Sequence, residues 1–175
     1  SKAVSKGIFH CMNNTGQSCN APTRMLIPAD KMDEAINISK ETVLKLKVGD
    51  PQDVNISMGP VVNKNQFLKI KEYISRGIEE GATLVTGREE TIKDNEKGYF
   101  ISPTIFANVT KDMTISKEEI FGPVLSIIGY HSEEEAIDIA NDSIYGLSGY
   151  ISSNDTTKAK QFASKSVSYT HLRAH

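Results

Sequence analysis

The chain has 175 residues, and its 20 Lys and Arg against 22 Asp and Glu give a formal net charge of −2. This length can bury the core of one domain, and the balanced charge argues against a nucleic-acid-binding surface. No apolar stretch approaches the length of a membrane span, and the first residues lack the apolar region of a signal peptide. The two cysteines, Cys11 and Cys19, form no CxxC pair, which favours a reducing cytoplasm over a disulfide framework or a zinc site.

The first half of the chain predicts helices and strands in alternation. A helix-like apolar run at 8–12 precedes a strand-like run at 25–27. Asp30 is expected to cap a helix that ends near residue 48, where Gly and Pro follow. A further helix is expected at 65–80, because its apolar residues recur at spacings of three and four and a glycine follows it. The apolar stripe of this helix consists of Phe67, Ile70, Ile74 and Ile78.

Strand patterns dominate the middle of the chain. Residues 83–86 predict a short strand, and 87–98 a charged surface loop. The aromatic and β-branched run at 99–109 is interrupted by Pro103, so we expect two short strands there. The nearly continuous apolar run at 124–130 is typical of a strand buried on both faces of a parallel sheet.

The remaining patterns complete an α/β alternation. Ser132 starts a capping box for a helix, residues 145–152 are strand-like, and Asn154 or Asp155 can cap a last helix. Helices alternating with strands predict an α/β fold with a mostly parallel sheet flanked by helices.

Cys19 is the most informative single residue. It lies in a polar, glycine-containing connection between the first helix and the first strand, where a scaffold can present a reactive side chain. A thiol acts as a nucleophile in its thiolate form, and backbone N–H groups in such a turn can stabilise both the thiolate and an oxyanion. By residue type alone, however, a free cysteine is more often a small buried hydrophobe.

Two motifs alter the interpretation of Cys19. The string GQSCNAPTR at 16–24 closely resembles the catalytic-cysteine segment of the NAD(P)-dependent aldehyde dehydrogenase superfamily. The string KEEIFGPV at 117–124 is similar to the second signature of that family, about a hundred residues downstream, as the family requires. The resemblance extends from about residue 9 to about residue 166.

The resemblance implies a role for five residues and a cofactor, NAD or NADP. Cys19 would attack an aldehyde to give a thiohemiacetal, which transfers a hydride to NAD(P)⁺ and leaves a thioester. Glu119 would hold the nicotinamide ribose hydroxyls, and Phe121 would pack near the nicotinamide ring. Gln66 and Lys69 match positions that contact the ribose on the adenosine side. Arg24, close to the nucleophile in sequence, is expected to form a structural salt bridge.

The resemblance also implies what the chain lacks. In this family the general-base glutamate, the oxyanion-hole asparagine and most of the dinucleotide-binding domain lie upstream of the nucleophile, and oligomer contacts lie downstream. We therefore expect a catalytic-domain fragment at 1–167, inactive alone, from a parent that forms a homo-oligomer, either a dimer or a tetramer. The tail at 168–175 departs from the family and is expected to be aberrant or disordered. His171 and His175 could share a helical face as metal ligands, but no third ligand is near.

The sequence leaves three other functions open. A CoA-acylating aldehyde dehydrogenase would release the acyl group to coenzyme A instead of water. A cysteine hydrolase or acyltransferase would pair Cys19 with a histidine, although nothing in the sequence supports a catalytic dyad of Cys19 and His10. In a non-catalytic fragment, Cys19 would react no faster than any free thiol.

Overall fold

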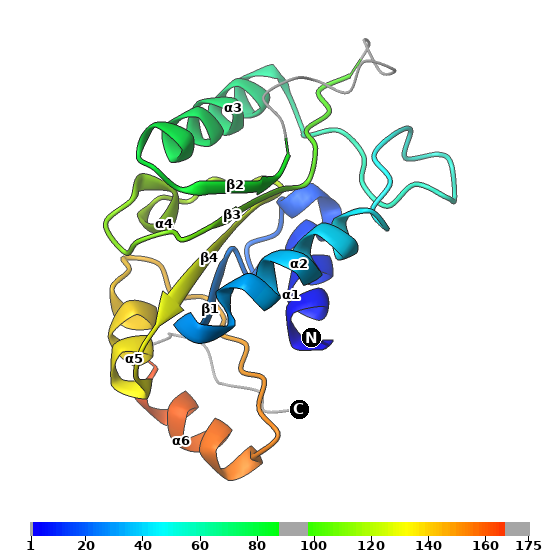
Figure 1. The fold of residues 1–175 in the computed structure, drawn as a ribbon. Helices are drawn as coiled ribbons and strands as arrows, with labels where there is room; N and C mark the ends of the chain where they lie inside the picture. Colours follow the sequence, from blue (N-terminus) through cyan, green and yellow to red (C-terminus); the bar gives the residue numbers. More distant parts are fainter. Residues whose placement is uncertain (1, 88–97, 167–175) are drawn as a thin grey trace.

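The fold is an α/β sandwich built on one four-stranded sheet (Figure 1). The computed structural model describes residues 2–87 and 98–166. Its elements in chain order are α1 (Lys2–Met12), β1 (Arg24–Pro28), α2 (Met32–Val43), α3 (Lys64–Glu79), β2 (Thr83–Thr86), β3 (Thr104–Ala107), α4 (Thr114–Lys117), β4 (Val124–Tyr130), α5 (Glu133–Asn141) and α6 (Thr156–Lys165), with 3₁₀ turns at Asn13–Gly16 and Ala29–Lys31. The predicted fold class is confirmed.

The sheet is mostly parallel and has the order β1-β4-β3-β2. Strand β4 lies between β1 and β3 and is parallel to both, whereas β2 pairs antiparallel with β3. In the register of the parallel strands, Leu26 of β1 pairs with Ile128 of β4, and Phe106 of β3 pairs with Ser126 of β4. The two strands richest in buried residues, β3 and β4, therefore form the middle of the sheet, as their near-continuous apolar sequences indicate.

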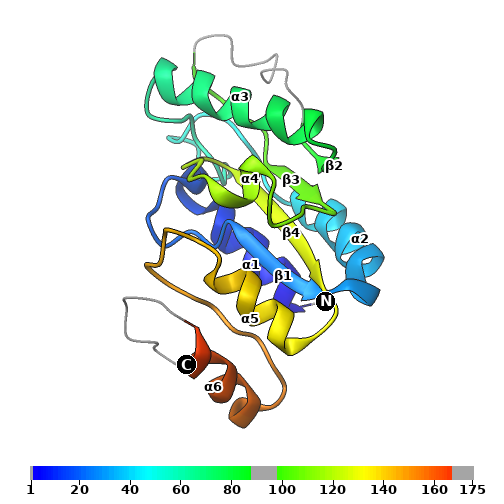
Figure 2. The same cartoon turned by 90° about the vertical axis from the view of Figure 1, so that its left-hand side faces the viewer.

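Helices cover both faces of the sheet, as the two views in Figures 1 and 2 show. Leu125 and Ile127 of β4 pack with buried residues of α1 and α2. Val124 and Ile128, which alternate with them, pack with buried residues of α3, α4 and α5. The alternation follows from the two-residue period of a strand and buries β4 on both sides.

Several predicted elements are confirmed because local signals define their ends. Helix α3 begins after Asn63, whose side chain accepts a hydrogen bond from the Gln66 N–H at 2.9 Å, and it ends before Gly81, which has φ of +92°. At the start of α5 the Ser132 hydroxyl accepts from the Glu135 N–H, and the Glu135 carboxylate accepts from the His131 N–H. The strands at 83–86 and 124–130 also form as predicted.

The structure corrects the prediction for the helix at 30–48. Asp30 lies in a 3₁₀ turn, and α2 begins after Lys31, which makes no side-chain capping hydrogen bond. The helix ends at Val43 because the following segment pairs elsewhere: Val48 forms a parallel bridge with Met58, and the Gly49 N–H donates to the Met58 carbonyl at 3.0 Å.

Two strand predictions are wrong as well. Of the two short strands expected at 99–109, only β3 forms, because the Tyr99 carbonyl accepts instead from Val61, in the loop before α3. The segment at 145–152 is not a strand; it is irregular and exposed. A strand needs a hydrogen-bonding neighbour, and in the described part of the chain β1 and β2 form the edges of the sheet without it.

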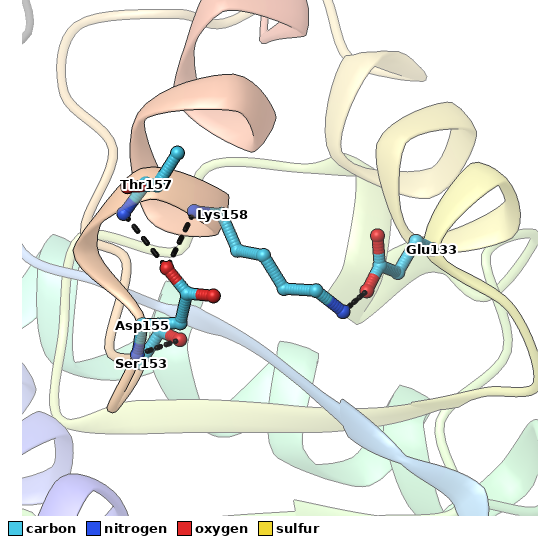
Figure 3. A network of polar contacts seen from close by, with 5 residues as sticks. All are labelled: Glu133, Ser153, Asp155, Thr157 and Lys158. Carbon is cyan, nitrogen blue, oxygen red and sulfur yellow. Dashed lines mark hydrogen bonds and ion pairs between the residues drawn. The ribbon is translucent and has the colours of Figure 1, made fainter.

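Helix α6 lies next to α5 and away from the sheet in both views (Figures 1 and 2). Asp155 caps it, since its carboxylate accepts hydrogen bonds from the Thr157 and Lys158 N–H groups (Figure 3). The Lys158 ammonium lies 3.3 Å from the Glu133 carboxylate at the start of α5. No residue of α6 is buried, so surface contacts hold it in place.

Some expectations fall on parts of the chain that the structure does not describe. These are most of the predicted loop at 87–98, the tail at 168–175, and both His171 and His175. Within residues 2–87 and 98–166, no helix is long and apolar enough to cross a membrane. The same residues contain no group of three or more His, Cys, Asp and Glu side chains that could hold a metal ion.

Candidate active site

The loop that carries Cys19 reverses the chain immediately after α1. Asn14, Thr15 and Gly16 all adopt left-handed backbone conformations, with φ of 50°, 57° and 70°. The Asn14 side-chain amide donates to the Gln17 carbonyl at 3.1 Å, a local bond that suits asparagine in this conformation. Cys19 follows in an exposed turn before β1. The predicted placement of this thiol, on a loop between a helix and a strand, is therefore confirmed.

Within residues 2–87 and 98–166, the main-chain N–H of Cys19 donates no hydrogen bond. Among residues 2–87 and 98–166, the turn contacts around it run from the Gln17 N–H to the Asn14 carbonyl and from the Ala21 N–H to the Ser18 carbonyl. The first bond closes a turn that ends before Cys19, and the second closes a turn that contains Cys19. The Cys19 side chain is exposed, and neither turn uses its main-chain N–H.

The second motif forms the turn between α4 and β4. Ile120 is buried with an exposed fraction of 4 %, whereas Glu119 is exposed. Phe121 has φ of +57°, a conformation that is unfavourable for a bulky side chain. The Pro123 carbonyl accepts from the Thr104 N–H at 2.9 Å, which ties the end of this turn to β3. Below, "the 119–122 turn" refers to Glu119, Ile120, Phe121 and Gly122.

The two motifs are in direct contact through their main chains. A Cβ atom on Gly16 would lie 2.1 Å from the Gly122 carbonyl oxygen, so only glycine allows this approach. Since Gly16 precedes Cys19 by three residues, the loop at 13–23 (the nucleophile loop, after the role predicted for Cys19) and the 119–122 turn are packed together. The motifs are about a hundred residues apart in sequence, and the parallel sheet brings them together.

Gln66 and Lys69, predicted to contact the cofactor, both lie on α3 and point to this turn. The Gln66 side-chain amide donates to the carbonyls of Ile120 and Phe121, at 2.8 and 2.9 Å. The Lys69 ammonium donates to the Glu119 carbonyl at 3.0 Å. The structure thus brings four of the predicted site residues together, and two of them hold the main chain of the others.

The segment before α3 holds the nucleophile loop in a similar way. The Thr15 hydroxyl donates to the Gly59 carbonyl at 3.1 Å, and the Val62 N–H donates to the Gln17 side-chain oxygen at 2.9 Å. Sequence patterns did not single out Thr15 or Gln17 for this task. In the sequence, only the glycine next to them indicates a turn. No local signal identifies hydrogen-bond partners that lie about 45 residues away.

Cys11 lies in a different environment from Cys19. It is fully buried between α1 and the sheet, and its Sγ lies 3.8 Å from the Val124 carbonyl oxygen. Burial raises the pKa of the Cys11 thiol from its ordinary 9.0 to about 12. Both thiols are free, and Cys11 serves as a small apolar residue of the core.

Arg24 has a structural position, although its hydrogen-bond partner is a carbonyl. Its guanidinium donates to the Ile139 carbonyl near the end of α5. Desolvation lowers the pKa of Arg24, and the negative charge of Asp142 partly opposes this. Arg24 therefore links the first residue of β1 to the C-terminal turn of α5.

His10 packs against Tyr150. Their ring centroids are 4.6 Å apart in an edge-to-face arrangement. The Tyr150 hydroxyl donates to the Asn20 carbonyl at 3.2 Å, which connects the irregular segment after α5 to the residue that follows Cys19.

A surface groove lies away from these loops. It is lined by Val43, Leu46, Val48, Val85, Thr86, Gly87, Ser102 and Pro103. None of the predicted site residues lines it, so the candidate site is defined by the two packed loops and by α3.

Comparison with known proteins identifies the family to which this geometry belongs. The sequence profile of the aldehyde dehydrogenase family matches residues 1–169. The chain therefore belongs to the aldehyde dehydrogenase family.

Individual relatives agree with this assignment. The chain is 47 % identical over 161 residues to a 3-succinoylsemialdehyde-pyridine dehydrogenase from a Pseudomonas species, covering 92 % of this chain and 34 % of the relative. A crystal structure of aldehyde dehydrogenase C from Pseudomonas syringae, with NAD⁺ and octanal, superposes with a TM-score of 0.94 at 37 % identity. That match covers 98 % of this chain and 37 % of the other. A Mycobacterium tuberculosis aldehyde dehydrogenase complexed with NAD⁺ gives a TM-score of 0.91 at 41 % identity, covering 95 % and 35 %.

The matches cover very different shares of this chain and of its relatives. The chain spans about a third of the length of the relatives that it matches, while nearly all of the chain is matched.

Proposed function

We propose that this chain is part of an enzyme that oxidises an aldehyde to a carboxylic acid with NAD(P)⁺, with Cys19 as the nucleophile. One observation carries the proposal: the exposed Cys19 loop packs, main chain against main chain, on the 119–122 turn. That packing brings the loop that carries Cys19 against the turn that carries Glu119 and Phe121. Solved relatives that hold NAD⁺, one of them with octanal, support this choice of cofactor and substrate class.

The residues of the 119–122 turn fit a nicotinamide nucleotide. Glu119 is exposed while its own carbonyl is held by Lys69, so its acceptor-only carboxylate stands on a fixed backbone, as binding of two ribose hydroxyls requires. Phe121 is half-buried beside it and offers an aromatic surface to a planar ring. When bound, NAD(P)⁺ supplies a two-electron acceptor for hydride. Gln66 and Lys69 stay predicted ribose contacts.

Cys19 then supplies the covalent chemistry. The Cys19 thiol would give up its proton to water, and the thiolate sulfur would attack the aldehyde carbon, so that the carbonyl oxygen becomes an oxyanion within reach of the Cys19 main-chain N–H. The oxyanion would re-form a carbonyl as the hydride on the same carbon leaves to the bound nicotinamide nucleotide, which gives a thioester on Cys19. Water cleaves the thioester to a carboxylate and the free thiol. Release to coenzyme A is the alternative, which gives an acyl-CoA product instead.

The first experiment measures NAD(P)H formation by the full-length protein that carries this chain, with a panel of aldehydes. We expect turnover in the wild type and a loss of roughly 10³-fold or more in kcat for Cys19→Ala, because the nucleophile is gone. Cys11→Ala is the matched control, since it removes the other thiol outside the site, and it should retain turnover. Absence of reduction with every aldehyde, or an active Cys19→Ala, would refute the proposal.

Product analysis in the same assay separates the alternatives. The hydrolytic enzyme gives a carboxylate without added coenzyme A, whereas the acylating enzyme depends on it. A cysteine hydrolase would cleave thioesters without NAD(P)⁺, and a non-catalytic fragment would show no enhanced thiol reactivity. Because the chain covers about a third of its relatives, we expect the 175-residue chain alone to give no turnover.

A further inference from the structure

One face of α3 contacts every residue of the 119–122 turn. Gln66, Lys69 and Ile70 lie on that face at spacings of three and four. Gln66 donates to the carbonyls of Ile120 and Phe121, and Lys69 donates to that of Glu119. The next residue, Gly122, is packed so closely that a Cβ would lie 2.4 Å from Cδ1 of Ile70.

The two hydrogen bonds from Gln66 are linked to the backbone conformation of Phe121. Successive carbonyls of an extended strand point in opposite directions, so a single nitrogen cannot reach two of them. The left-handed conformation of Phe121, with φ of +57°, accompanies the approach of both carbonyls to one Gln66 amide. Since a bulky residue does not hold this conformation unaided, its surroundings must stabilise it.

The effect of Gln66 extends to the nucleophile loop through main-chain packing. The Gly122 carbonyl is in contact with Gly16, which precedes Cys19 by three residues. A shift in the peptide between Ile120 and Phe121 would therefore alter the surface on which the nucleophile loop rests. Both halves of the candidate site thus depend on the same backbone.

We propose that Gln66 is a positioning residue: its side-chain amide holds the 119–122 turn in its left-handed form before any cofactor binds. It acts through the backbone of Ile120 and Phe121, and this role is distinct from that of a ribose ligand. The kinetic part of the inference rests on the function proposed above. The structural part does not, because it concerns the cofactor-free protein.

The test compares Gln66→Met with Gln66→Lys in the full-length protein. Methionine keeps the length of the side chain without a donor, whereas lysine restores an N–H donor of similar reach. Glu72→Gln is the control, because it breaks only an exposed ion pair with Arg76 on the same helix. The readout is hydrogen–deuterium exchange without cofactor over residues 118–124, where the Val124 N–H donates to the Gly122 carbonyl.

We expect exchange at 118–124 to rise about tenfold in Gln66→Met and to return near the wild-type rate in Gln66→Lys, with β1 unchanged in both. The kcat for NAD(P)H formation should fall and recover in parallel. Unchanged exchange in Gln66→Met, with only a weaker affinity for NAD(P)⁺, would overturn the proposal in favour of a ligand role. Failure of Gln66→Lys to restore slow exchange would also overturn it, because the donor would then be irrelevant.

Two provisions keep the test decisive. If Gln66→Met does not fold, Gln66→Glu takes its place, since it keeps the shape but sets carboxylate oxygens against two carbonyls, and the same rise in exchange is expected. If the wild type forms no NAD(P)H, the proposed function fails, while the exchange measurement still decides the role of Gln66.

Discussion

Cys11 and Cys19 show how environment assigns different roles to one residue type. Cys11 is enclosed between α1 and the sheet, and its pKa of about 12 keeps it a neutral thiol. Cys19 stands exposed at the tip of a loop that three left-handed residues shape. Residue type alone favours a buried, inert thiol. Cys11 is buried as expected, whereas Cys19 is exposed.

The buried thiol predicts a loss of stability at alkaline pH. In the unfolded chain Cys11 ionises near its ordinary pKa of 9.0, whereas in the fold it does so near 12. The unfolded state therefore loses the proton first, so the contribution of Cys11 is complete below pH 9 and falls as the pH rises to 12, by ~1.4 kcal/mol per unit. Urea midpoints at pH 8 and pH 10 should differ more for the wild type than for Cys11→Ala. Equal pH dependence in the two proteins would contradict this.

Gly16 predicts a large cost for a single methyl group. Alanine there must adopt a φ of +70° and also displace the Gly122 carbonyl. We expect Gly16→Ala to lower the free energy of unfolding by ~3 kcal/mol or more, as measured by urea denaturation. Gly81→Ala is the matched control, because Gly81 has φ of +92° but no atom within 4 Å of its Cβ position. A cost for Gly16→Ala no greater than the control's would show that the two loops do not touch as described.

At the scale of elements, α6 illustrates a helix that depends on its cap. It buries no residue. Its described polar contacts are the hydrogen bonds that the Asp155 carboxylate accepts, the ion pair between Lys158 and Glu133 (Figure 3), and a hydrogen bond of 3.1 Å from the Asn141 amide to the Lys165 carbonyl. Of the cap and the ion pair, the cap should matter more, because both ends of the ion pair are 65 % exposed and such pairs contribute little.

Removal of the cap should therefore loosen α6 alone. We expect Asp155→Ala to destabilise this helix by about 1 kcal/mol and to speed amide exchange over Thr156–Lys165, while β4 exchanges as before. Asp155→Asn retains a capping oxygen and should behave like the wild type. Lys158→Met should have the smaller effect; if its effect exceeds that of Asp155→Ala, the ion pair rather than the cap anchors the helix.

Elements with signals at both ends could be predicted from sequence, and those that need a distant partner could not. Helix α3 forms within a residue of its prediction because the apolar stripe within it and the glycine after it are local signals, and the structure adds the Asn63 cap at its start. The segment at 145–152 has an equally good strand pattern but no adjacent strand in the described chain. The sequence pattern indicates which conformation a segment favours, but a strand forms only where a neighbouring strand can hydrogen-bond to it.

The candidate site was predictable in its parts but not in its assembly. The motifs around Cys19 and Glu119 are local strings, and each was recognisable on its own. The contact between Gly16 and Gly122, and the bonds from Gln66 to the 119–122 turn, join residues far apart in sequence. No local pattern specifies such contacts: the sequence predicts Gln66 as a ribose contact, and nothing in it indicates hydrogen bonds to the 119–122 turn.

At the scale of the whole molecule, the sheet assembles the site. Strand β1 follows the nucleophile loop and β4 follows the 119–122 turn, and these two strands pair in parallel. Parallel pairing places the N-terminal ends of both strands at the same end of the sheet, so the loops that precede them must meet there. Helix α3 packs on the same end and holds the second loop. Membership of the aldehyde dehydrogenase family is in keeping with this arrangement.

If Cys19 is the nucleophile, it carries the acyl group during turnover, and mass spectrometry of the full-length protein detects that group most directly. The enzyme is mixed with NAD(P)⁺ and an aldehyde, quenched in acid within the first turnovers, and digested. We predict that the peptide containing Cys19 gains the mass of the acyl group, in proportion to the NAD(P)H formed, while the peptide containing Cys11 does not. NAD(P)H formation without acylation of Cys19, or with the acyl group on another residue, would contradict the account.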